Sequence, residues 1–277
     1  MPLKPRNRAV SCRLLSRVVT PFRHIPGRDL AEETPVAISF NGTTQAVMMA
    51  SPQDLQDFAY GFALSEGLVS EIADIERFEI VTHDKGIEAQ LWLSAEKAEA
   101  LAARRRKMAG PVGCGLCGID SLHEAMRALP NLISLTSDLE QSDLATASDH
   151  LRSQQPLHDQ TRAVHAAGFL IAGKGIVMAR EDVGRHNALD KLIGALMRAG
   201  RDPATGAFVI TSRASMDMVQ KTAMAGGAIL IAVSAPTALA VDVAKEAGVT
   251  LVAFARSPEF EIFSHPNRIE AGPKNVT

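Results

Sequence analysis

The sequence of 277 residues has few cysteines, no strong excess of charge of either sign and no long apolar run. Its cysteines, Cys12, Cys114 and Cys117, are sparse and odd in number, which argues against a secreted disulfide scaffold and favours a reducing cytoplasm. A formal net charge of −2 provides no general attraction for nucleic acid or for an anionic membrane, so neither is expected as a partner.

No uncharged segment is suited to cross a membrane or to act as a secretory signal. The longest one, residues 222–241, is interrupted by two glycines and by Pro236, and a buried strand between two helix ends explains it better. At the N-terminus, seven basic side chains precede the first acidic residue, Asp29, so residues 1–28 are expected to form a basic, flexible tail.

Residues 29–108 have the pattern of a small α+β domain. Residues 33–42 and 44–51 are typical of two strands joined by an Asn-Gly turn, and residues 78–94 are typical of a second hairpin. A helix is expected after each hairpin, and the second should cover residues 95–108, which have helix-forming composition throughout.

The second half of the chain, residues 109–277, has the pattern of a larger α/β domain. Residues 168–180 are typical of a hairpin. Apolar runs of strand length then occur at residues 207–211, 228–233 and 250–255, with helical segments between them. Strands separated in this way by helices form parallel, right-handed crossovers, which place the helices on the faces of the sheet.

Polar loops follow three of the predicted strands, at the edge where α/β sheets bind their ligands. These loops cover residues 181–187, 211–215 and 234–237. They contain Arg185 and Arg213, whose guanidinium groups suit bidentate contacts with phosphate. His186 lies among dense charge in the first loop, and His165 precedes a predicted strand. The pattern therefore predicts a pocket for an anionic, phosphate-bearing ligand.

The most distinctive short segment is GPVGCGLCGI at residues 110–119, where Cys114 and Cys117 form a C-x-x-C pair. A structural zinc site needs four ligands, and the chain has neither a second cysteine pair nor the H-x-E pattern of deaminases, so no metal site is expected. A redox pair fits the spacing. A cysteine that carries sulfane sulfur also fits, because the flanking glycines give the backbone freedom to reach two partners. The residues alone leave both alternatives open.

A set of longer segments, all in a fixed order, carries a resemblance to a known family. They are ETPVAI at 33–38, DFAYGFALSEG at 57–67, GCGLCG at 113–118, VHAAG at 164–168, EDVGRHNALDKLIG at 181–194, SRASMDMVQKTAMAG at 212–226 and VSAPTALAVDVA at 233–244. With them the chain resembles the formate dehydrogenase accessory sulfurtransferase family over nearly its full length.

The resemblance implies a cytidine-deaminase-like fold for the larger domain, without the deaminase zinc chemistry. It also implies a cytoplasmic homodimer that carries persulfide sulfur from a cysteine desulfurase to the bis(molybdopterin guanine dinucleotide) molybdenum cofactor of formate dehydrogenase. The family's persulfide cysteine falls on Cys114, and Cys117 takes a supporting role. A cofactor-binding chaperone without sulfur chemistry and a disulfide oxidoreductase are the alternative functions.

The family's guanine-dinucleotide segment falls on FARSPE, which comprises Phe254, Ala255, Arg256, Ser257, Pro258 and Glu259. Its last two residues depart from the family pattern, since a proline offers no backbone N–H and a glutamate repels phosphate. Contacts with the nucleotide are therefore expected from Arg256 together with Arg185, His186, Ser212 and Arg213 of the neighbouring loops. GDP is the expected fragment ligand.

Overall fold

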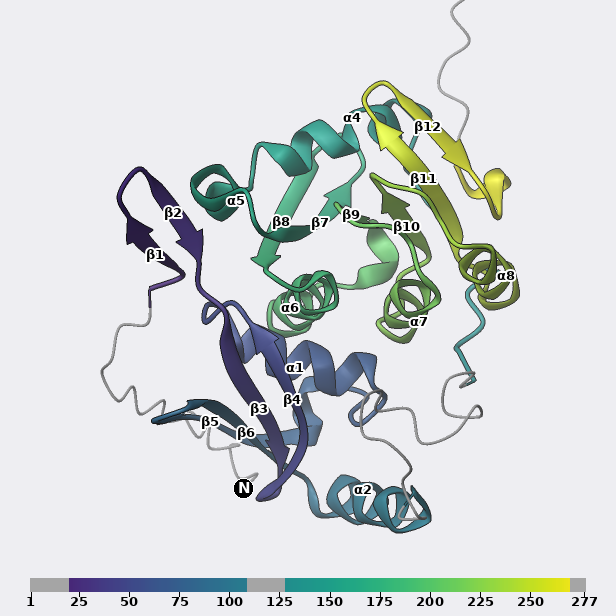
Figure 1. The fold of residues 1–277 in the computed structure, drawn as a ribbon. Coiled ribbons are helices and arrows are strands. Elements are labelled where there is room, and N and C mark those ends of the chain that lie inside the picture. Colours follow the sequence, from purple (N-terminus) through teal and green to yellow (C-terminus); the bar gives the residue numbers. More distant parts are fainter. Residues whose placement is uncertain (1–19, 109–127, 270–277) are drawn as a thin grey trace, which may run out of the picture.

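The computed structural model describes residues 20–108 and 128–269, which form two large β-sheets with helices between and around them (Figure 1). The cysteines, and with them the predicted site at Cys114 and Cys117, lie outside the described residues.

The smaller of these two sheets has the strand order β4–β3–β6–β5 and contains both predicted hairpins. Its strands are β3 (Thr34–Phe40), β4 (Thr43–Ala50), β5 (Ile75–His83) and β6 (Gly86–Leu93). A parallel pairing of β3 with β6 joins the hairpins and aligns Ile38 with Ala89. Their common face is buried against helix α1 (Leu55–Ser65), where Phe58 is fully buried. Helix α2 (Ala95–Met108) follows β6, as predicted.

A separate hairpin, β1 (Phe22–Ile25) and β2 (Arg28–Ala31), projects from the body of the molecule (Figure 1). It turns at Gly27, whose φ of +86° is costly for any residue with a side chain. The expectation of a flexible tail over residues 1–28 therefore does not hold for residues 22–28, because backbone pairing orders them. Residues 1–19 lie outside the described range.

The larger sheet has the strand order β12–β11–β10–β9–β7–β8. Its strands are β7 (His165–Ile171), β8 (Gly175–Asp182), β9 (Ala207–Ile210), β10 (Ile229–Ala232), β11 (Thr250–Arg256) and β12 (Glu259–Ile262). β9, β10 and β11 are parallel, as predicted, whereas β7 and β12 run antiparallel to their neighbours. The start of β7 therefore lies at the same edge as the ends of β9, β10 and β11.

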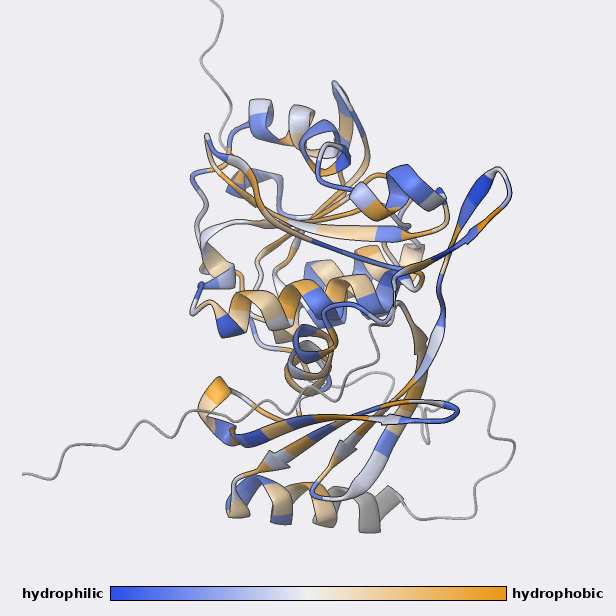
Figure 2. Ribbon diagram, turned by 90° about the vertical axis from the view of Figure 1, so that its left-hand side faces the viewer, coloured by the Kyte–Doolittle hydropathy of each residue, from blue (hydrophilic) through white to orange (hydrophobic). Residues whose placement is uncertain are grey.

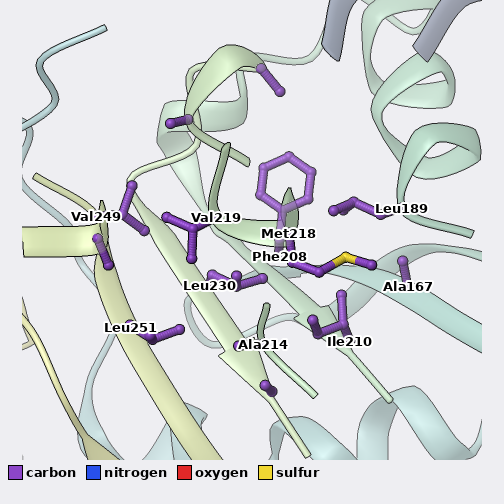
Figure 3. Close-up of a cluster of buried hydrophobic side chains, with 14 of the residues drawn as sticks. Ala167, Leu189, Phe208, Ile210, Ala214, Met218, Val219, Leu230, Val249 and Leu251 are labelled. Atoms are coloured by element: carbon purple, nitrogen blue, oxygen red, sulfur yellow. The ribbon is translucent and has the colours of Figure 1, made fainter. Parts of the chain in front are cut away.

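Helices cover both faces of the larger sheet. Helix α4 (Gln141–Arg152) packs on one face, and α6 (Arg185–Arg198), α7 (Met216–Met224) and α8 (Ala238–Ala247) pack on the other. Figure 3 shows part of the second core, where Leu189 and Val219 from the helices lie near Phe208 and Leu230 from the strands. The short helix α5 (Pro156–Thr161) follows α4. A mixed α/β fold is thus confirmed, while its cytidine-deaminase-like character and the division at residues 108 and 109 stay predictions.

Helix α1 joins the two sheets by packing closely on α6 (Figure 2). A Cβ atom on Gly61 would lie 1.7 Å from the carbonyl oxygen of Asp190, and one on Gly194 would lie 1.9 Å from that of Asp57. Only glycine lets the two helix backbones approach to this distance. The segments DFAYGFALSEG and EDVGRHNALDKLIG thus meet through one glycine each.

A buried ion pair also links the larger sheet and α6 to the loop after β4. Asp182 and Lys191 are both fully buried and lie 2.7 Å apart. The backbone N–H of Ser51, from the loop after β4, donates to Asp182 at 3.0 Å, and the Lys191 ammonium donates to the Ser51 carbonyl at 2.9 Å. Burial lowers the pKa of Lys191, although Asp182 opposes that shift. Removing either partner would leave an uncompensated buried charge.

A second buried group ties the end of α1 to α6 and α7. Lys221 donates to Asp190 and to Glu66, each at 2.9 Å, and Ser65 donates to Asp190 at 2.7 Å. Burial alone would lower the pKa of Lys221, but the carboxylates of Asp190 and Glu66 raise it above its ordinary value. Lys221 is therefore held in its charged form.

Candidate functional site

A cavity of about 550 Å³ opens at the edge of the larger sheet where the parallel strands end. Thr211 follows β9, Val233 follows β10 and Arg256 ends β11, while His165 begins the antiparallel β7. These residues come from four strands, and strand direction alone brings them to one edge. The cavity thus lies where α/β sheets bind ligands.

Helices α4 and α5 supply the opposite wall of this cavity, with Ser148, Asp149 and Arg152 from α4 and His158 from α5. The backbone N–H of Ser257 donates to the Ser148 hydroxyl at 3.2 Å, which fastens the β11–β12 turn to α4.

Glu181 holds α5 in place from the end of β8. Its carboxylate accepts hydrogen bonds from the backbone N–H groups of Leu157 and His158, both at 2.8 Å. Burial raises the pKa of Glu181, and these two N–H groups oppose the shift. Glu181 was predicted as part of a ligand-binding loop, but here it orders the wall of the cavity.

His165 is a half-buried polar group inside the cavity. Its Nδ1 lies 3.4 Å from the Thr211 hydroxyl. Burial lowers the pKa of His165, and the positive charge of Arg185 lowers it further. A neutral imidazole at pH 7 can both donate and accept a hydrogen bond, which suits a sugar hydroxyl better than a fixed charge does.

The predicted nucleotide segment is only partly in this cavity. Arg256 and Ser257 line it, whereas Phe254, Ala255, Pro258 and Glu259 do not. Phe254 is 42% exposed and its ring lies 6.1 Å from that of Phe263. Pro258 and Glu259 are exposed in the β11–β12 turn and at the start of β12. Their departure from the family pattern therefore affects the turn rather than the wall of the cavity.

The other predicted ligand residues, Arg185, His186, Ser212 and Arg213, lie outside the cavity at the same sheet edge. Arg185 and His186 begin α6, while Ser212 and Arg213 precede α7. Arg185 and Arg213 are exposed, and the Ser212 hydroxyl donates to the Arg213 carbonyl at 3.0 Å. The structure thus separates the predicted set into a cavity group and a neighbouring group at two helix N-termini.

His186 is the most perturbed residue of that neighbouring group. Its Nε2 is buried without a hydrogen-bond partner among the described residues, and it lies 3.9 Å from the Asp217 carboxylate. Burial lowers its pKa from 6.5 to about 4, and the charges of Arg185 and Lys221 act in the same direction, against Asp217 and Glu66. His186 is therefore neutral at pH 7.

This perturbation predicts a pH dependence of stability. In the unfolded chain His186 returns to a pKa of 6.5, so between pH 6.5 and 4 the unfolded state binds the proton first. The free energy of unfolding therefore keeps its full value above pH 6.5 and decreases as the pH falls towards 4. Solvent screening limits this decrease to about 1 kcal/mol. Urea unfolding at pH 7 and pH 5 should show a smaller loss for His186→Gln than for the natural protein. Equal losses in both proteins would contradict this assignment.

Sequence reasoning missed the wall formed by Asp149, Arg152 and His158. These residues lie in a stretch without any motif, and no local pattern places α4 over the ends of strands more than fifty residues later. Conversely, Asp182 belongs to the predicted ligand loop at residues 181–187 but is instead a buried partner of Ser51 and Lys191.

No group of three histidine, cysteine, aspartate or glutamate side chains within residues 20–108 and 128–269 is placed to hold a metal ion. Among the helices of these same ranges, none has the length and apolar character to cross a membrane.

The fold defines a class of α/β protein with a cavity at the edge of a mixed sheet, where three adjacent parallel strands end, and with a smaller β-sheet joined to it through α1. The chain belongs to the FdhD/NarQ family, whose model matches residues 31–270. The family membership inferred from its motifs is confirmed.

Relatives with curated names match nearly the whole chain. The chain is 52% identical over 242 residues to the sulfur carrier protein FdhD of Agrobacterium fabrum. This alignment covers 87% of this chain and 89% of the relative. It is 46% identical over 268 residues to the protein of the same name from Xanthomonas oryzae, with 95% of each chain covered.

A solved structure supports the same relationship. The chain is similar, with a TM-score of 0.66 and 25% identity, to the crystal structure of a protein from Desulfotalea psychrophila described as a formate dehydrogenase accessory protein. The match covers 90% of this chain and 96% of that one.

Proposed function

We propose that this protein carries persulfide sulfur from a cysteine desulfurase to the bis(molybdopterin guanine dinucleotide) molybdenum cofactor of formate dehydrogenase. The observation that carries the proposal is its identity of 52% over 242 residues with a protein named as a sulfur carrier. The GCGLCG segment at residues 113–118 supplies a cysteine of the required type.

In the proposed step, the thiolate of Cys114 attacks the outer sulfur of the desulfurase persulfide. A new sulfur–sulfur bond forms on Cys114 as the old one breaks, and the desulfurase cysteine leaves as a thiolate. No external oxidant or reductant is needed, because the sulfane sulfur keeps its oxidation state. Cys117 assists by protecting or releasing the persulfide.

The cavity at the edge of the larger sheet is the proposed site for the nucleotide end of the cofactor substrate. Its volume of about 550 Å³ is within the usual range for small-ligand pockets. Arg256 is exposed on its wall and is free to contact phosphate, whereas Arg152 is already paired with Asp159. Thr211 and His165 offer hydrogen bonds suited to a ribose. GDP is accordingly the proposed fragment ligand.

The protein is proposed to work in the cytoplasm as a homodimer that meets the desulfurase and the formate dehydrogenase catalytic subunit. Edge strand β4 offers support for self-association, because it has no charged side chain along Thr43–Ala50 and exposes 63% of Val47 and 45% of Met49. Exposed edge strands without charge are prone to pair with another strand.

Mass spectrometry of intact protein and of its peptides tests the sulfur step. After incubation with a cysteine desulfurase and cysteine, the peptide that contains Cys114 should gain one sulfur atom, and a thiol reductant should remove it. Cys114→Ala should gain none, while Cys12→Ala serves as the control and should behave like the natural protein. A chaperone without sulfur chemistry would gain no sulfur on any peptide, and a disulfide oxidoreductase would instead lose two hydrogens from the pair.

A further inference from the structure

We infer that Asp149 selects guanine in the cavity by accepting hydrogen bonds from the base, an inference that rests on the proposed nucleotide site. Among the described residues that line the cavity, Asp149 is the one carboxylate, and it stands among two arginines and two histidines. A carboxylate only accepts hydrogen bonds and repels anions, so its presence in a site proposed for a phosphate-bearing ligand indicates a separate role.

The carboxylate of Asp149 has no structural partner among the described residues. It lies exposed on α4 and makes no hydrogen bond or ion pair with any side chain or backbone group of the described residues. Arg152, one turn further along the same helix, pairs with Asp159 on α5 instead. Both oxygens of Asp149 therefore remain available to a ligand.

Charge determines which part of a nucleotide can lie against Asp149. A phosphate there would be repelled, whereas a group with N–H donors would be attracted. The pairing edge of guanine presents two adjacent N–H donors, at N1 and at the exocyclic N2, and these match the two oxygens of one carboxylate. Adenine presents an acceptor at N1, and xanthine presents a carbonyl oxygen where guanine has its amino group.

The remaining walls suit the rest of such a ligand. Val164 and Val233 offer apolar surface for the face of a base, and the rings of His158 and His165 add flat surface beside them. Arg256, at the end of β11, provides a cation for the phosphates. Attraction for the base edge and attraction for the phosphates thus come from different elements, α4 and β11.

Hydrogen bonds from a ligand to a charged acceptor contribute strongly to discrimination, because the wrong ligand leaves the charge desolvated and unpaired. The full chain is therefore expected to bind GDP about a hundredfold more tightly than ADP or xanthosine diphosphate. Asp149→Asn should reverse the preference, because an amide accepts from N1–H and donates to the xanthine oxygen but opposes the guanine amino group.

Equilibrium titration of the full chain with GDP, ADP and xanthosine diphosphate tests the inference. Asp149→Asn should lose about a hundredfold in GDP affinity and gain affinity for xanthosine diphosphate. The matched control is Asp242→Asn, the same change at an exposed position of α8 that does not line the cavity, and it should bind like the natural protein.

The possible outcomes distinguish base selection by Asp149 from the existence of the proposed nucleotide site. If the natural protein binds GDP and Asp149→Asn binds it equally well, Asp149 does not select the base, while the nucleotide site stands. If the natural protein binds no nucleotide at millimolar concentration, both the site and the inference are overturned. Equal affinity of the natural protein for all three nucleotides would also overturn the inference.

Discussion

Replacing Gly61 with alanine is expected to destabilise the protein by about 3 kcal/mol or more. The added Cβ would lie 1.7 Å from the backbone oxygen of Asp190, and no side-chain rotation can relieve a contact between a Cβ and a backbone atom. Helices α1 and α6 would have to separate, which also lengthens the hydrogen bonds from Ser65 to Asp190 and from Lys221 to Glu66. Urea unfolding measures the change.

Gly27→Ala is the matched control for this variant. Its φ of +86° imposes backbone strain, but nothing lies within 4 Å of the added atom, so a cost of about 1 kcal/mol is expected. A cost for Gly61→Ala no larger than that of Gly27→Ala would mean that the α1–α6 contact adjusts freely. The two sheets would then not be locked together in the way that the glycine contact indicates.

The Cys114→Ala variant is expected to reduce formate dehydrogenase maturation by at least a hundredfold. A persulfide carrier needs a thiolate to form its covalent intermediate, and alanine removes the nucleophile outright. The measurement is formate dehydrogenase activity in cells that lack the natural protein and produce each variant at the same level.

Two further cysteine variants make this experiment specific. Cys12→Ala should restore full activity, because the resemblance assigns no role to Cys12. Cys117→Ala should keep part of the activity, in line with a supporting role. Full activity of Cys114→Ala would exclude the carrier mechanism and favour a cofactor-binding chaperone.

Local chemistry made most strands of both sheets predictable, although the short strand β12 was not expected. An Asn-Gly turn marks the β3–β4 hairpin, and short apolar runs bounded by polar loops mark β9, β10 and β11. Helix α2 followed from composition in the same way. These signals lie within a few residues of one another, so chain neighbours suffice to determine them.

The candidate site was only partly predictable. Arg256 and Ser257 line the cavity, as their segment indicated, but Arg185 and Arg213 begin or precede helices beside it. A strand-end position specifies the edge of the sheet and not which face a side chain reaches. That depends on how each helix packs.

The sequence by itself determined the family, the strand pattern and the identity of the thiol proposed to carry sulfur, because motifs and periodicity are local properties of the chain. Tertiary structure alone decided that Asp182 pairs with Lys191 and binds Ser51, which lies 131 residues earlier. It alone placed Asp149 and Arg256 on the walls of one cavity. Such contacts depend on the burial of whole faces and on the free energy of excluding water from them, which no short segment encodes.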